Sequence, residues 1–411
     1  MKNYFPNDYQ AFIHTSRYAK WLDSENRREN WGETVNRYVD NLVLPKIKDD
    51  ETVMAIREAI TNLDVMPSMR AMMSSGKAFD RDNVAGYNCS YLPVDDIRSF
   101  DEAMFILLCG TGVGFSVERQ YVNQLPQVPM NLINLDETIV VPDSKEGWAY
   151  SLRTLISSLY NGLIPKWDVS LVRPAGAKLK TFGGRASGPA PLVDLFQFVV
   201  SKFKEASGEK LTSLQCHDIM CKIGEVVVVG GVRRSAMISL SNLSDDRMRH
   251  AKSGAYWEAN GQRNLANNSV AYTEKPDSTS FMREWLSLVE SGTGERGIFN
   301  RQAAQNQAAK NGRRDSSYEF GTNPCSEIIL RPYQFCNLTE VVIRSGDTEQ
   351  DLERKIAVAT ILGTLQATYT KFPYLRQVWQ DNTNEERLLG VSLTGIMDNP
   401  LTTTANPELP A

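Results

Sequence analysis

The order of apolar and polar residues along the chain predicts helices at the N-terminus and mixed helices and strands after them. Apolar residues recur at helical spacing through residues 8–65, for example at Ile56 and Ile60. A second stripe, rich in small residues that permit close packing, predicts a helix over residues 347–371. The apolar run Ala236–Leu240 is typical of a strand. We therefore expect a helical N-terminal packing layer and a mixed α and β body.

Three further segments carry weaker signals. Residues 121–147 are rich in loop-forming positions, and a helix is expected to begin near Asp143–Gly147. The run Val226–Val229 fits either a buried strand or the end of a helix that the following glycines stop. Cys216 and Cys221 lie about 140° apart on a helix, so we expect two core cysteines and not one site.

Composition excludes several classes of protein. At 411 residues and 42% hydrophobic content, the chain can bury a large core and hold two or three domains. A net charge of −4 disfavours a nucleic-acid binder that depends on phosphate contacts. No apolar run is long enough for a membrane span, and the first residues lack a signal peptide's apolar core, so a cytosolic protein is expected.

The six cysteines and three histidines limit the kinds of disulfide and metal site that the chain can form. Structural disulfides are unexpected in a cytosolic chain of this size, so a pair that does form one would be catalytic. The three histidines have no metal-ligand spacing, and we expect neither a zinc nor a di-iron site.

The stretch from Asn323 to Cys336 is the part of the chain that carries most chemistry. An amide, a thiol and a carboxylate stand at Asn323, Cys325 and Glu327, and a second thiol follows the first by eleven residues. Residues two apart share one face of an extended chain, and Pro324 favours an extended Asn323. We therefore expect one stiff finger to present all three side chains to one substrate.

These residue types suggest radical or redox work on a hydroxylated substrate. Glu327 can act as a general base and Asn323 can hold a hydroxyl or carbonyl. Cys325 lacks the neighbouring histidine that a nucleophilic cysteine needs, whereas a thiyl radical needs no adjacent base. Such chemistry requires two more thiols as reductant, for which Cys336 and Cys89 are candidates.

Two other stretches leave their roles open. Ser68 can cap a helix that begins in the methionine-rich segment Met66–Gly76. The basic, glycine-rich stretch Arg173–Pro189 is either a phosphate-binding loop or an ordinary solvated loop.

Together these motifs resemble the ribonucleotide reductases, and most closely the monomeric, adenosylcobalamin-dependent (class II) ribonucleoside-triphosphate reductases. The likeness covers almost the whole chain. It rests on seven ordered segments: 66–70, 87–89, 173–191, 230–236, 267–270, 323–338 and 387–395.

The resemblance implies a role for each residue of the finger. Cys325 would carry the thiyl radical that removes the 3′-hydrogen of the ribose, and Glu327 would take the 3′-hydroxyl proton. Asn323 would hold the hydroxyl region. Cys89 and Cys336 would reduce the substrate and become a disulfide. Ribonucleoside triphosphates would become 2′-deoxyribonucleoside triphosphates, the precursors of DNA.

The resemblance also implies binding residues and partners. Ser68 and Asn88 would contact the substrate together with Asn323. A deoxynucleotide effector would bind near five residues, Asp95, Asp96, Lys178, Lys180 and Arg185. A thioredoxin-like dithiol would restore the thiols, and the complete enzyme would be a monomer that needs neither nucleic acid nor membrane.

The implied fold is a ten-stranded α/β barrel around a central finger loop. A helical region would span residues 1–65 and a partial barrel residues 66–411. Within that barrel the effector region would lie at about 95–270 and the finger at 320–338.

The family's barrel continues well beyond residue 411, so we expect an N-terminal part of a reductase that is incomplete alone. The absent part would hold the substrate-phosphate loop, most of the cobalamin site and a C-terminal cysteine pair. Two alternatives stay open: a class I large subunit that needs a radical-generating partner, and a nucleotide-binding fragment without activity.

Overall fold

The structure is a computed structural model that describes residues 4–177, 185–229 and 237–403. The chain divides into two compact units. Unit 1 holds residues 1–88, 335–373 and 377–411, and unit 2 holds residues 89–334 and 374–376. Each unit is therefore described by itself.

Unit 1 contains the predicted N-terminal helices and a small sheet. Strand β13 pairs in parallel with β14 and antiparallel with β3. The elements of this unit are α1 (Asp8–Ile13), η1 (His14–Tyr18), β1 (Trp21–Leu22), β2 (Arg27–Arg28), α2 (Trp31–Tyr38), η2 (Val39–Val43), α3 (Asp50–Thr61), β3 (Val65–Met66), α4 (Met69–Ser74), α5 (Lys77–Arg81), η3 (Asn83–Gly86), β13 (Gln334–Val342, whose first residue belongs to unit 2), α15 (Glu349–Gln366), α16 (Gln377–Glu386), β14 (Leu389–Thr394), η5 (Ile396–Asp398) and α17 (Pro400–Thr403).

The helices of unit 1 begin where the sequence provides caps and bury apolar faces. Asn30 and Glu33 form a reciprocal capping box at the start of α2, and Thr348 and Asp351 form another at the start of α15. Side chains from α2, α3, α4, β13 and α15 make one hydrophobic core, which includes the buried Val341. The helices predicted over residues 8–65 and after residue 347 are thus present.

Unit 2 is built on five parallel strands in the order β10-β9-β8-β5-β4. Its elements are β4 (Cys89–Pro93), α6 (Arg98–Leu108), β5 (Gly112–Ser116), α7 (Arg119–Val122), β6 (Ile133–Val140), α8 (Lys145–Tyr160), β7 (Leu163–Asp168), α9 (Ala190–Glu205), α10 (Ser213–Val229), β8 (Met237–Asn242), α11 (Asp246–Arg249), α12 (Tyr256–Asn260), η4 (Gly261–Leu265), β9 (Ala266–Tyr272), α13 (Ser278–Ser291), β10 (Gly297–Asn300), α14 (Arg301–Ala309), β11 (Gly321–Thr322) and β12 (Ile329–Leu330).

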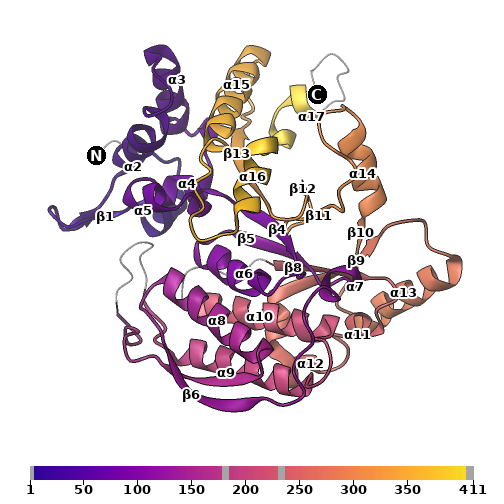
Figure 1. Cartoon of the computed structure of the whole chain (residues 1–411). Coiled ribbons are helices and arrows are strands. Elements are labelled where there is room, and N and C mark those ends of the chain that lie inside the picture. Colours follow the sequence, from indigo (N-terminus) through magenta and orange to yellow (C-terminus); the bar gives the residue numbers. More distant parts are fainter. Residues whose placement is uncertain (1–3, 178–184, 230–236, 404–411) are drawn as a thin grey trace. The chain divides into compact units, whose positions relative to one another are not determined.

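Helices cover this sheet, as parallel strands require. Every residue of β4 and β5 is buried, which fits a sheet that is packed on both faces. Helices α6, α8, α9 and α10 pack on one another as a layer (Figure 1). The predicted strand near residues 236–240 is β8, and the predicted helix start near Ser144 is the capped start of α8.

The loop-rich interpretation of residues 121–147 holds for about half of the segment, which also contains the end of α7, the strand β6 and the start of α8. The strand β6, which pairs in parallel with β7, was not predicted. Most side chains of β6 are exposed, so the buried alternation that marks a strand is missing from its sequence. The run Val226–Val229 is the end of α10, and Cys216 and Cys221 are fully buried in that helix, as expected for core cysteines.

Among the described residues, no helix has the length and apolar character that crossing a bilayer demands.

Candidate active site

The finger predicted from the sequence is a short hairpin in unit 2. Strands β11 and β12 pair antiparallel through Gly321–Leu330 and Thr322–Ile329. Cys325 and Glu327 lie in the connecting turn, and both side chains are exposed. The two strands have only two residues each, and an isolated hairpin of this size is marginally stable. The hairpin therefore depends on the structure around it.

Asn323 closes the turn of this hairpin. Its main-chain carbonyl accepts a hydrogen bond from Ser326 N at 3.0 Å, with Pro324 at the favoured second position of a β-turn. Its side-chain Oδ1 accepts from Ile328 N at 3.0 Å. Ser326 has a φ of 69°, so the chain reverses here instead of running extended.

The expectation that Asn323, Cys325 and Glu327 share one extended face is therefore wrong. Asn323 is fully buried, whereas Cys325 and Glu327 are exposed beyond the turn. The β-turn that begins at Asn323 and the left-handed Ser326 break the alternation of an extended strand. The thiol and the carboxylate remain close in sequence at the tip, and the amide lies beneath them.

The buried amide of Asn323 connects the finger to Cys89. Its Nδ2 donates to Cys89 Sγ at 3.5 Å, within the range for a sulfur acceptor. Cys89 is the first residue of β4 and is 8% exposed. The structure thus brings Asn323 and one predicted redox cysteine together, through a bond that the sequence did not predict.

Ser68, Asn88 and Cys336 come together in unit 1. Ser68 Oγ donates to Asn88 Oδ1 at 2.8 Å, and Asn88 N donates to the carbonyl of Cys336 at 3.3 Å. Cys336 lies in β13 and is 1% exposed. Ser68 is also the N-cap of α4, so its predicted capping role is confirmed. These contacts place three predicted site residues on one continuous set of hydrogen bonds.

Gln366, near the end of α15, is a site residue that the sequence reasoning missed. Its Oε1 accepts from Ser68 N at 3.0 Å, and its Nε2 donates to Asn337 Oδ1 at 2.8 Å. Asn337 follows Cys336 directly, so one buried amide holds both the serine and the strand that carries the thiol. Gln366 and Cys336 are thirty residues apart in the sequence, and no local motif marks the pair.

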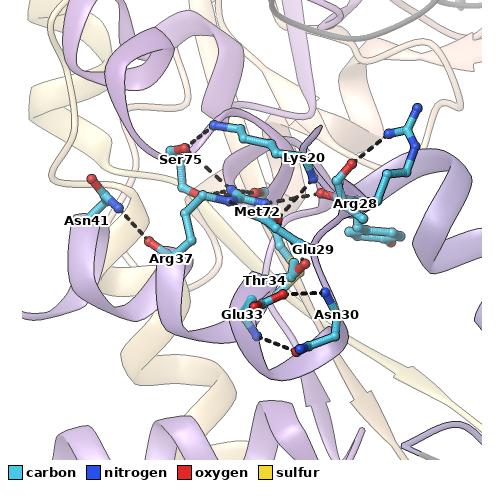
Figure 2. Close-up of polar contacts among 12 residues, drawn as sticks. Lys20, Arg28, Glu29, Asn30, Glu33, Thr34, Arg37, Asn41, Met72 and Ser75 are labelled. Atoms are coloured by element: carbon cyan, nitrogen blue, oxygen red, sulfur yellow. Dashed lines mark hydrogen bonds and ion pairs between the residues drawn. The ribbon is translucent and has the colours of Figure 1, made fainter. Parts of the chain in front are cut away.

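A second missed group supports the C-terminal end of α4 (Figure 2). Arg37 forms an ion pair with Glu29 at 2.7 Å and donates to the carbonyl of Met72 at 2.7 Å. Lys20 Nζ donates to the carbonyl of Ser75 at 2.5 Å. Burial lowers the pKa of Lys20 to about 8. Cationic side chains thus bind the last carbonyls of the helix that Ser68 begins.

The predicted effector residues are only partly described. Lys178 and Lys180 lie outside the described residues. Arg185 is exposed and donates to the carbonyl of Gly176 at 2.8 Å.

Asp95 and Asp96 have partners within unit 2. Asp95 accepts a hydrogen bond from the hydroxyl of Tyr333, and burial raises the pKa of Asp95. Asp96 forms an ion pair with Arg376 at 3.3 Å, and the Arg376 guanidinium stacks 4.6 Å from the Tyr333 ring centre. Tyr333 lies eight residues after Cys325, so this acidic pair contacts the segment that leaves the finger.

Comparison with known proteins gives consistent results at the sequence level. Residues 127–202 match the family described as the insertion domain of B12-dependent ribonucleotide reductase. The adenosylcobalamin-dependent ribonucleoside-triphosphate reductase of Lactobacillus gasseri is 30% identical over 476 residues, which cover 94% of this chain and 61% of that protein. The protein of the same name from Lactobacillus helveticus is 30% identical over 464 residues, covering 93% and 60%.

Solved structures agree with these matches. A B12-dependent (class II) ribonucleotide reductase superimposes with a TM-score of 0.76 at 25% identity, covering 94% of this chain and 62% of that one. The chain resembles the class II ribonucleotide reductases. The α subunit of a class Id reductase from Actinobacillus ureae gives a TM-score of 0.54 at 12% identity, covering 96% of this chain and 61% of that one, and it shows a shared fold alone.

The resemblance to class II reductases and the α/β fold class predicted from the sequence are therefore confirmed. The chain spans about three fifths of the length of the relatives it matches. The insertion domain at residues 127–202, which includes β6, α8, β7 and most of α9, was missed by the sequence reasoning. The sequence of β6 lacks the alternation of buried and exposed residues that marks a strand, so the first element of this domain was not predicted.

Proposed function

We propose that this chain belongs to an enzyme that reduces ribonucleoside triphosphates to 2′-deoxyribonucleoside triphosphates by thiyl-radical chemistry. The observation that carries the proposal is the contrast among the thiols. Cys325 alone of the six is exposed, at the tip of a hairpin, whereas Cys89, Cys109, Cys216, Cys221 and Cys336 are buried. An exposed thiol can meet a substrate and a radical source, and a protected pair of thiols can supply electrons.

The reaction then follows from the side chains at the site. The Cys325 thiyl radical takes the 3′-hydrogen of the ribose, and Glu327 accepts the 3′-hydroxyl proton. The 2′-hydroxyl takes a proton and leaves as water, and C2′ gains a hydrogen in its place. Cys89 and Cys336 supply the two electrons and two protons for this exchange and form a disulfide, and Glu327 returns its proton to the 3′-oxygen. Cys325 returns the hydrogen to C3′ and is again a radical. Asn323, beneath the tip, orients the turn and contacts Cys89.

The cofactor that fits this arrangement is adenosylcobalamin. An exposed cysteine beyond a tight turn, with apolar and amide groups buried behind it, fits a group that must approach the thiol from outside the hairpin. When bound, adenosylcobalamin supplies the one-electron chemistry that converts a thiol into a thiyl radical. The residues of this chain hold Cys325 in place and protect the two reducing thiols.

The remaining assignments belong to the same proposal. Ser68 and Asn88 bind the substrate, and Asp95, Asp96, Lys178, Lys180 and Arg185 belong to the effector region at about 95–270. A helical region at residues 1–65 precedes a partial barrel at 66–411, with the finger at 320–338. A thioredoxin-like dithiol reloads the cysteines of a cytoplasmic enzyme that is monomeric when complete.

Deoxynucleotide formation tests this proposal. The chain is mixed with a ribonucleoside triphosphate, adenosylcobalamin and a dithiol, alone and together with the C-terminal two fifths of the Lactobacillus gasseri reductase as a separate polypeptide. We expect product in the complemented mixture, none with Cys325→Ser, and unchanged product with Cys216→Ala as the matched control. Product that requires a second radical-generating protein would instead indicate a class I subunit. Nucleotide binding without product in any mixture would contradict the proposal.

A further inference from the structure

The root of the finger lies directly on the parallel sheet of unit 2. A Cβ atom at Gly321 would lie 2.1 Å from the Tyr91 ring of β4, and one at Gly114 of β5 would lie 1.9 Å from the carbonyl oxygen of Thr322. Both distances are too short for any side chain. Backbone and ring therefore meet without intervening atoms, and the position of the root depends on groups that fix it along the sheet.

A buried ion pair provides such a group. Arg301 donates from Nη1 and Nη2 to the two oxygens of Glu118, at 2.8 and 2.6 Å. Its Nε donates to the carbonyl of Phe320 at 2.7 Å, one residue before β11 begins. The side chains of Arg301 and Glu118 are 2% and 0% exposed. One guanidinium thus joins the end of β5 to the chain that enters the finger.

Neighbouring groups complete the attachment. Glu118 also accepts hydrogen bonds from Ser116 Oγ at 2.8 Å and from Gln120 Nε2 at 3.0 Å. Tyr121 donates its hydroxyl to Glu319 at 2.7 Å, so the residue before Phe320 is held as well. Each oxygen of the Glu118 carboxylate therefore accepts one hydrogen bond from Arg301 and a second from a neighbouring side chain, which fixes its orientation.

The Glu118–Arg301 ion pair is better explained by a role in positioning the finger than by a contribution to the stability of the protein. Removing two charges from water costs several kcal/mol per ion in general, and apolar residues of the same volume often stabilise a protein as well or better. A planar, bidentate guanidinium instead fixes direction, because its donors have a rigid geometry. Hydrogen transfer to a thiyl radical depends on placement, and displacement of a reacting atom by about 1 Å can cost about a hundredfold in rate.

We propose that Glu118 and Arg301 are positioning residues that hold the finger root through the carbonyl of Phe320 and thereby set the place of Cys325. The part of this inference that concerns catalysis rests on the proposed function. The part that concerns the geometry of the finger does not.

A second ion pair in the same unit provides a matched control. Arg296 donates from Nε and Nη2 to the two oxygens of Glu284, at 2.7 and 2.6 Å, and from Nη1 to the carbonyl of Asn242 at 3.1 Å. The side chains of Arg296 and Glu284 are 1% and 5% exposed. The chemistry and the burial match the Glu118–Arg301 pair, but the carbonyl that Arg296 holds belongs to the last residue of β8 and not to the finger root.

The experiment compares Arg301→Lys with Arg296→Lys in the 411-residue chain. Hydrogen exchange is followed at the amides of Ser326 and Ile328, which are bonded within the turn, and Cys325 is alkylated with iodoacetamide and quantified by mass spectrometry. We expect Arg301→Lys to speed exchange at these amides about tenfold or more and to change the alkylation rate, because a charge-assisted bond to the root is lost. Arg296→Lys should leave both within about twofold, although both variants lower the melting temperature.

A second variant distinguishes a loosened finger from general misfolding of the protein. Glu118→Gln preserves the shape of the side chain while it removes the charge, and it should produce the same loosening of the finger with less loss of overall stability. In the complemented reductase assay, Arg301→Lys should lower kcat with little change in KM.

The outcomes separate the two ideas. Equal effects of Arg301→Lys and Arg296→Lys on the finger, or no effect of Arg301→Lys in a folded protein, would overturn the positioning role. Failure of the unmodified chain to form product in the complemented mixture would instead count against the proposed function, and the exchange result would still decide the positioning role.

Discussion

The tip and the root of the finger differ in almost every physical property. At the tip, Cys325, Ser326 and Glu327 are exposed. At the root, Phe320, Gly321 and Thr322 are buried, and the backbone touches β4 and β5 without room for a methyl group. In the proposed reaction the chemistry lies at the tip, and the contacts that hold the tip in place lie at the root. Substitutions at the root should therefore mainly lower the stability of the fold. Substitutions at the tip should mainly lower activity.

The largest effect is expected from Gly114→Ala at the root. The new methyl group would overlap the main-chain oxygen of Thr322, at 1.9 Å from the ideal Cβ position, and neither backbone can move cheaply. We expect a loss of about 3 kcal/mol or more in the free energy of unfolding, at the upper end of overpacking costs.

Chemical denaturation measures this loss. Gly261→Ala is the matched control in the same unit, because nothing lies within 4 Å of its ideal Cβ position and the substitution should be nearly neutral. A Gly114→Ala variant as stable as Gly261→Ala would show that the root is not in contact with β5.

A smaller loss is expected from Asn323→Ala, between root and tip. The substitution removes the acceptor for Ile328 N and the donor to Cys89 Sγ, so the partly buried amide hydrogen of Ile328 loses its partner. The expected cost is about 1–3 kcal/mol. Asn306→Ala, at an exposed position in α14, should change stability by less than about 0.5 kcal/mol. Asn323→Asp separates the two bonds, since it keeps the acceptor but loses the donor, and equal losses for Ala and Asp would contradict the role of Oδ1.

The tip could be predicted from the sequence, whereas the root could not. Cys325 and Glu327 stand in one short motif with Asn323, and their chemistry follows from the side chains themselves. Arg301 and Glu118 lie 183 residues apart and act through a main-chain carbonyl, which no residue type encodes. Gln366 was not predicted either, because its hydrogen bonds join segments that meet only in the folded unit.

The fold shows the same division. Helices with buried stripes, such as α15, were expected from local pattern, and the structure adds the Thr348–Asp351 capping box to that helix. The strand β6 was missed because its pairing with β7 leaves most of its side chains in solvent. The extended finger was wrongly expected because the turn depends on Ser326 in the left-handed region, which its residue type does not demand.

The partly buried Lys20, which donates to the carbonyl that follows α4 in unit 1, extends the comparison and should respond to pH. Burial lowers the folded-state pKa of Lys20 to about 8, below the value near 10.5 expected when unfolded. Between these values the unfolded chain binds the extra proton, so the contribution of Lys20 to stability rises with pH from about 8 to 10.5 and is constant below 8. We therefore expect the stability difference between the unmodified chain and Lys20→Met to shift in favour of lysine between pH 7.5 and 10.

Denaturation at the two pH values measures this shift. Lys166→Met is the control, because Lys166 is exposed and pairs with Asp136, which is also exposed. A difference between the unmodified chain and Lys20→Met that does not change with pH would show that the ammonium group is not held in a buried site.

The smallest effect on stability is expected at the tip, from Cys325→Ser. An exposed side chain in a turn contributes little to folding, so the substitution should change the free energy of unfolding by less than about 0.5 kcal/mol. Cys216→Ser, in the fully buried part of α10, should lower the free energy of unfolding by about 1–3 kcal/mol, because a polar hydroxyl would replace the thiol at a position away from water. The two variants make the same chemical change, and only the first removes the radical-bearing sulfur of the proposed reaction. A Cys325→Ser variant that unfolds as readily as Cys216→Ser would mean that the tip supports the hairpin and that the root is not its sole anchor.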